Sequence, residues 1–60
     1  MMIRAGDLVK LSDEIYEPEI VQDWGLGTVV RVSIQYKTIS VWWWKQGVER
    51  VFATKAVETI

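Results

Sequence analysis

Cysteine and histidine are both absent from this 60-residue chain. Without cysteine there is no disulfide and no thiolate metal ligand, and without histidine the commonest transition-metal ligand and the commonest general base are missing. There is one proline, and no repeat or low-complexity segment marks a domain boundary. We therefore expect a single domain over residues 1–60, with no catalytic residues, no metal site and no cofactor.

The charges of the two signs nearly cancel, and the basic residues are spread along the chain. Seven basic and eight acidic residues give a formal net charge of −1. The basic residues occur singly, whereas non-specific nucleic-acid binding needs a basic patch. No uncharged stretch is longer than residues 38–44, and this stretch is far too short to cross a bilayer. The N-terminus lacks the apolar segment of a signal peptide. We expect a soluble intracellular or virion-associated protein that does not enter membranes.

Small size combined with many aromatic residues favours self-association. A domain of this length buries only about 60% of the surface of its unfolded chain, and domains without disulfides or metals often rely on oligomerisation. Four tryptophans in 60 residues are many for a monomer to bury. We therefore expect a homo-oligomer, a protein or peptide partner, or both.

Three of the tryptophans lie in residues 38–44, which we predict to be the central strand of an all-β domain. Side chains of a strand alternate between two faces. One face then carries Ile39, Val41 and Trp43, and the other carries Ser40, Trp42 and Trp44. Since a small barrel has one interior, Trp42 and Trp44 are either covered by a second chain or by a loop, or exposed as an aromatic surface.

The other strands are predicted at residues 8–11, 28–32, 48–53 and 57–60, with a 3₁₀ turn at residues 54–56. Val9, Leu11 and Phe52 are expected in the core, and Glu49 and Arg50 suit cross-strand partners. Thr28, Val30 and Val32 share one face of their strand. A bulge near Gly25 and Gly27 would instead turn Val29 inward.

Residues 12–24 differ in composition from the rest of the chain, because they hold five of the eight acidic residues. Pro18 argues against a central strand here, so we expect a long excursion between the first two strands, with a helical turn after Pro18. The excursion is either a solvated cover over an open barrel end or an acidic lip beside an aromatic groove.

The aromatic residues are the best candidates for a binding site, since aromatic side chains dominate the energetics of protein interfaces. Trp24 either caps the core or belongs to the surface site. An acidic lip would favour a basic or proline-rich peptide. The alternative is base stacking, with Lys45, Arg50 and Arg31 contacting phosphates. The candidate binding residues are Trp42, Trp44, Trp24, Tyr36 and Tyr16.

Four segments resemble a group of very small SH3-like proteins encoded by tailed, mostly marine, bacteriophages, most of them of unknown function. They are residues 6–11 (GDLVKL), 25–30 (GLGTVV), 41–43 (VWW) and 57–60 (VETI). The resemblance implies a five-stranded SH3-like barrel with a long loop between strands 1 and 2. It also implies a phage protein in the host cytoplasm or the virion. In that group the hairpin after the tryptophans often carries acids, whereas this chain has Lys45-Gln46-Gly47.

A second similarity concerns residues 51–58, whose order of residue types is similar to that at the end of type II dihydrofolate reductases. Those enzymes are SH3-like tetramers with a pore lined by a Val-Gln-Ile-Tyr run. The corresponding positions here are Glu49, Arg50, Val51 and Phe52, so the glutamine and the tyrosine hydroxyl are missing. An oligomeric pore enzyme is therefore the remote alternative to a non-enzymatic binding or assembly module.

Overall fold

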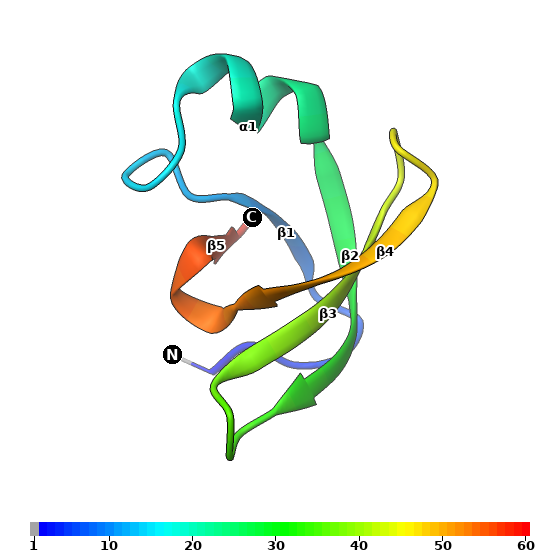
Figure 1. Cartoon of the computed structure of the whole chain (residues 1–60). Coiled ribbons are helices and arrows are strands. Elements are labelled where there is room, and N and C mark those ends of the chain that lie inside the picture. Colours follow the sequence, from blue (N-terminus) through cyan, green and yellow to red (C-terminus); the bar gives the residue numbers. More distant parts are fainter. Residues whose placement is uncertain (1) are drawn as a thin grey trace.

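A computed structural model describes residues 2–60 (Figure 1). All five strands form one antiparallel sheet of order β4-β3-β2-β1-β5, which curls around the core. The prediction of a small five-stranded all-β domain with a long first connection is confirmed. The elements are β1 (Leu8–Leu11), α1 (Pro18–Trp24), β2 (Leu26–Ser33), β3 (Thr38–Trp43), β4 (Val48–Ala53), the 3₁₀ helix η1 (Thr54–Ala56) and β5 (Val57–Thr59).

The hydrophobic core lies on the inner face of the curled sheet. Trp43 is its largest member and is fully buried, and half-buried Phe52 packs against it. The inward positions predicted for β1 and β3 are confirmed, because strand alternation carries every second side chain to the same face. The buried cluster consists of Val9, Leu11, Val29, Ile39, Val41, Trp43 and Val57.

Strand β2 departs from simple alternation. The register with β3 shifts between Val29 and Arg31, which marks a bulge. Val29 is buried and Val30 is about half exposed. The prediction that Thr28, Val30 and Val32 share one face is therefore wrong, because Val32 packs against the core while Val30 is exposed. The alternative with Val29 inward is confirmed. The bulge follows Val29 instead of lying at the glycines.

Helix α1 confirms the helical turn predicted after Pro18. Proline stands in the first turn, where its missing N–H removes no helical hydrogen bond. The helix ends at Gly25, whose φ of 66° is positive. Val21 and Trp24 lie three positions apart, so both face the sheet, and both pack against the core.

The turn between β3 and β4 holds the end of this helix. Lys45 Nζ donates a hydrogen bond to the carbonyl of Gln22 at 3.2 Å, and Gln46 Nε2 donates to that of Asp23 at 2.9 Å. Carbonyls in the last turn of a helix have no partner within the helix, and a cation there also favours the helix dipole. The turn that carries Lys45 and Gln46 therefore has a structural role, in which it caps α1.

Candidate functional site on the outer face of the sheet

The face of the sheet turned away from the core carries a group of exposed apolar side chains. Thr28 on β2 lies opposite Leu8 on β1 and opposite Trp42 on β3, and Leu26 lies opposite Lys10. Trp44 follows directly, and its backbone N–H donates to the Leu26 carbonyl at 3.1 Å. We call this surface the outer face, and its apolar members are Leu8, Leu26, Val30, Trp42, Trp44 and Val51, all of them exposed.

Trp44 is held in place on the outer face. Its indole Nε1 donates a hydrogen bond of 2.8 Å to Thr28 Oγ1, although 62% of the residue is exposed. Trp42 is also exposed, at 37%. An aromatic side chain fixed before binding loses less conformational entropy when a partner covers it. The outer face therefore presents a preorganised tryptophan, and neither α1 nor the long excursion hides it.

Replacing Thr28 by valine should release the Trp44 ring at little cost in stability. The methyl group keeps the shape of the threonine but cannot accept the indole hydrogen bond, which is worth about 1 kcal/mol. The Trp44 indole N–H resonance should shift and exchange faster with solvent, as measured by NMR. Thr38→Val, a threonine change on β3 away from Trp44, should leave that resonance unchanged.

Charges of both signs border the outer face. Lys10 Nζ lies 2.8 Å from a carboxylate oxygen of Asp13 and 3.6 Å from one of Glu58. The hydrogen bond to Asp13 is the main cause that raises the pKa of Lys10 above its ordinary value. Glu49 stands opposite Trp42, and Arg31 stands opposite Ser40. The outer face is therefore nearly balanced in charge.

The three basic residues expected to contact phosphates are not gathered beside the tryptophans. Lys45 is bound to the end of α1. Arg50 lies opposite inward-facing Val41, and its guanidinium donates to the Glu49 carbonyl at 3.0 Å. Only Arg31 shares the outer face. Glu49 and Arg50 both have cross-strand partners, as expected: Trp42 stands opposite Glu49, and Val41 stands opposite Arg50.

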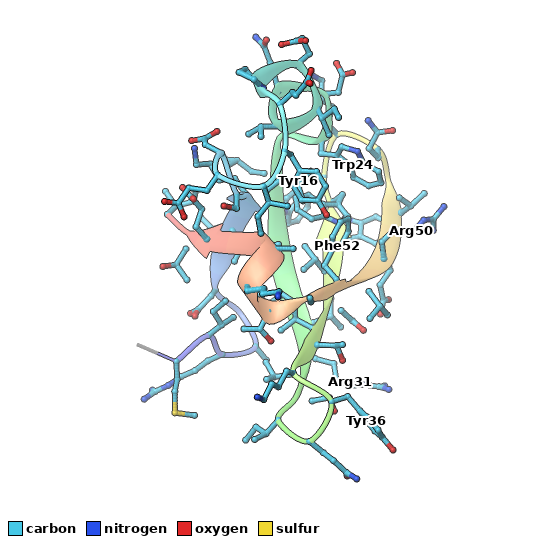
Figure 2. The ribbon with its side chains drawn as sticks, turned by 60° about the vertical axis from the view of Figure 1, so that its left-hand side comes forward. Tyr16, Trp24, Arg31, Tyr36, Arg50 and Phe52 are labelled. Carbon is cyan, nitrogen blue, oxygen red and sulfur yellow. The ribbon has the colours of Figure 1, made fainter. Side chains whose placement is uncertain are left out.

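Trp24 and Tyr16 lie away from the outer face, in an aromatic cluster over the core (Figure 2). The Trp24 ring centroid is 5.5 Å from that of Trp43 and 5.9 Å from that of Phe52, and Tyr16 lies 6.4 Å from Phe52. All these rings meet edge to face, the favoured geometry for aromatic pairs. Trp24 therefore caps the core, and Phe52 packs inside the domain.

Tyr36 lies at the end of the molecule opposite Trp24 (Figure 2) and is 72% exposed. It lines a separate cleft. The five candidate residues thus fall into three places, and only Trp42 and Trp44 share a surface. The structure adds four apolar neighbours to them, namely Leu8, Leu26, Val30 and Val51. Strand parity is the sequence signal for two of them, since Leu8 precedes Val9 and Val51 precedes Phe52, and both Val9 and Phe52 are predicted in the core.

Among residues 2–60, no group of three or more Asp or Glu side chains is placed to hold a metal ion. No helix in the described part of the chain is long and apolar enough to cross a membrane. Comparison of the chain with protein-family models, with curated proteins and with solved structures finds no match.

Proposed function

We propose that this chain is a non-enzymatic protein-binding or assembly module that acts through the outer face. The observation that carries the proposal is the set of six exposed apolar side chains on the outer face, among them Trp44, whose indole is fixed by Thr28. Isolated apolar residues are normal on a protein surface, whereas a contiguous group with a fixed aromatic residue is typical of an interaction site.

A second copy of the chain is the occupant that we propose first. A standard interface buries about 800 Å² on each partner, roughly a fifth of the 4385 Å² that the chain exposes. One face of the sheet can supply that area. Because the charges around the outer face are balanced, two copies can meet face to face without strong repulsion. The contact would be a symmetric one between identical surfaces.

The SH3-like family and the phage origin are proposed from the resemblance to small phage proteins. The long connection between β1 and β2 agrees with the SH3-like barrel that the resemblance implies, and η1 lies directly before β5, where a 3₁₀ turn was predicted. We accordingly propose an SH3-like phage protein in the host cytoplasm or the virion. Nucleic-acid binding is the second class of function that we consider. Its affinity would fall steeply as salt rises, whereas an apolar protein interface would be nearly indifferent to salt.

Light scattering tests the outer face directly. At about 0.5 M salt, where exposed ionic contacts are screened, the wild type should have twice the 7.0 kDa mass of one chain. Trp42→Ala combined with Trp44→Ala should be monomeric and still folded by circular dichroism. Leu26→Lys provides a second disruption of the same face that keeps both tryptophans.

Ile15→Ala is the matched control, because Ile15 is an exposed apolar residue that lies on the acidic excursion instead of the outer face. It should keep the mass of the wild type. A wild type that stays at 7.0 kDa at millimolar concentration would exclude a second copy as the occupant. A mass of four chains that survives the tryptophan substitutions would favour the remote pore-type alternative.

A further inference from the structure

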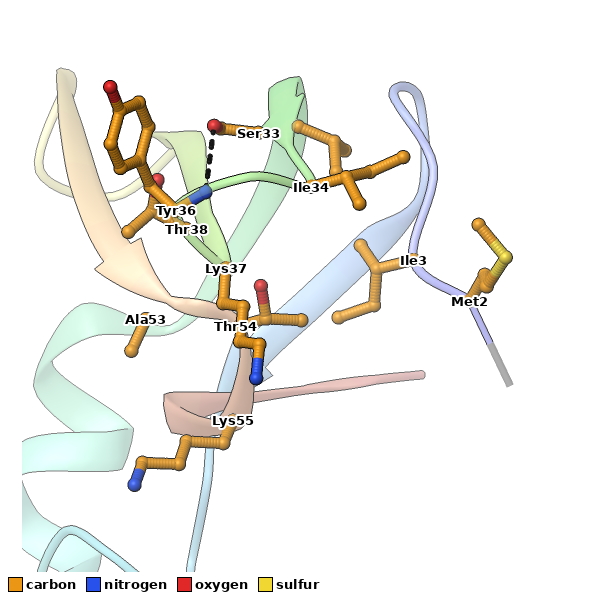
Figure 3. Close-up of a pocket in the computed structure, with 11 residues that line it drawn as sticks. Met2, Ile3, Ser33, Ile34, Tyr36, Lys37, Thr38, Ala53, Thr54 and Lys55 are labelled. Atoms are coloured by element: carbon orange, nitrogen blue, oxygen red, sulfur yellow. Dashed lines mark hydrogen bonds between the residues drawn. The ribbon is translucent and has the colours of Figure 1, made fainter.

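A cleft of about 690 Å³ opens at the end of the molecule formed by the β2–β3 turn (Figure 3). It lies between the N-terminal segment, this turn and η1. Its walls are largely apolar and include Ile3, Val32, Ile34 and Tyr36. The volume falls within the range of sites that hold a ligand or an apolar side chain of a partner.

The cleft is positively charged. Lys37 and Lys55 line it, and its lining includes no Asp or Glu side chain. Neither lysine forms an ion pair within residues 2–60. Arg31 lies toward the same end of the molecule (Figure 2). These unneutralised charges beside an apolar surface favour a partner that combines carboxylates with an apolar side chain.

The opposite end of the same chain has that composition. Within residues 2–60, four carboxylates of residues 12–24 form no ion pair, whereas Asp13 pairs with Lys10. Ile20 on α1 is 42% exposed, and Glu19 and Asp23 flank it on the solvent side of the helix. The four unpaired carboxylates are those of Glu14, Glu17, Glu19 and Asp23.

A chain cannot bring its own helix to its own cleft. The longest dimension of the molecule is 30 Å, and α1 and the β2–β3 turn lie at opposite ends (Figures 1 and 2). Helix α1 is also fixed by the hydrogen bonds from Lys45 and Gln46. Any contact between the two complementary ends therefore joins different copies.

We propose that the acidic end of one copy docks in the basic cleft of the next copy. Ile20 enters the apolar cleft, and the carboxylates of Glu17 and Glu19 pair with Lys37 and Lys55. This contact joins two different surfaces, so it repeats from copy to copy and produces a ring or an open chain. It does not involve the outer face and does not depend on the proposed function.

Charge reversal tests the contact. At low salt, the mass of the wild type should rise with concentration, and the rise should be lost at about 0.5 M salt. Lys37→Glu with Lys55→Glu should weaken this association about tenfold or more, and so should Glu17→Lys with Glu19→Lys. The variant that carries all four substitutions has the wild-type net charge and should regain association. Wild-type behaviour of both reversed variants would overturn the proposal.

Disulfide trapping locates the contact independently. Since the chain has no cysteine, an engineered disulfide can form only between the introduced positions. Asp23→Cys on α1 and Ile34→Cys in the cleft should cross-link rapidly at low salt when the two variants are mixed. Asp23→Cys mixed with Val51→Cys, an exposed position on the outer face, should cross-link slowly. Equal rates for the two mixtures would overturn the proposal.

Discussion

The variant Trp43→Ala is expected to be largely unfolded at 25 °C. Trp43 is fully buried, and its ring centroid lies 5.5 Å from those of both Trp24 and Phe52. Removal of a buried tryptophan side chain costs about 3–5 kcal/mol. A domain of this length has a total stability of roughly 3–9 kcal/mol, so this one substitution removes most of it. Urea unfolding followed by near-ultraviolet circular dichroism measures the loss.

Trp44→Ala is the control for this experiment. It removes the same type of side chain from the next residue in the chain, which lies on the outer face instead of in the core. Trp44 is mostly exposed, and its side chain donates one hydrogen bond, to Thr28. Its cost should be about 1 kcal/mol. If Trp43→Ala unfolded at the same urea concentration as Trp44→Ala, the position of Trp43 at the centre of the core would be wrong.

The variant Gly27→Ala should have the second-largest effect, although it adds only one methyl group. A Cβ atom at Gly27 would overlap Val41 Cγ1 and would lie 2.9 Å from Trp43 Cε3 and 3.0 Å from the Trp42 carbonyl oxygen. The carbonyl belongs to the backbone of a central strand and cannot move away freely. Overpacking of this kind costs about 1–3 kcal/mol, and thermal unfolding measures it.

Gly47→Ala separates this steric effect from the general cost of replacing glycine. No atom lies within 4 Å of a Cβ at Gly47, but its φ of 66° is unfavourable for alanine, by about 1–2 kcal/mol. Adding Val41→Ala to Gly27→Ala should recover part of the loss because it relieves the closest overlap, whereas adding it to Gly47→Ala should destabilise further. Additive effects in both pairs would contradict the packing around Gly27.

The tryptophan strand could be assigned from the sequence because its pattern is local. Strand alternation with period two places Ile39, Val41 and Trp43 on one face, whatever the neighbouring strands are. The same rule turns Trp42 and Trp44 outward. Alternation does not say whether the long excursion covers them, and the structure answers this by placing Trp24 against Trp43 in the core.

The inner face of β2 could not be assigned from local pattern, because a bulge depends on the pairing of two strands. Val29 and Val30 are the same residue type, and only the register shift against β3 decides which one is buried. The cleft was missed for a related reason. Its wall combines Ile3, Ile34 and Thr54 from three separate segments, so no single stretch of sequence carries its signature. Two apolar residues in an exposed turn, Ile34 and Tyr36, were the available hint.

The pairing of β1 with β5 also determines when the domain can be completed during synthesis. Val9 lies opposite Thr59, so β1 meets its second partner only after all the residues between the two strands have been synthesised. Until then β1 has one unpaired edge, and the place of Val57 in the core is empty. Contacts this distant in sequence slow folding, and an unpaired strand edge is open to misassembly. The nascent chain therefore completes its fold only after β5 has emerged.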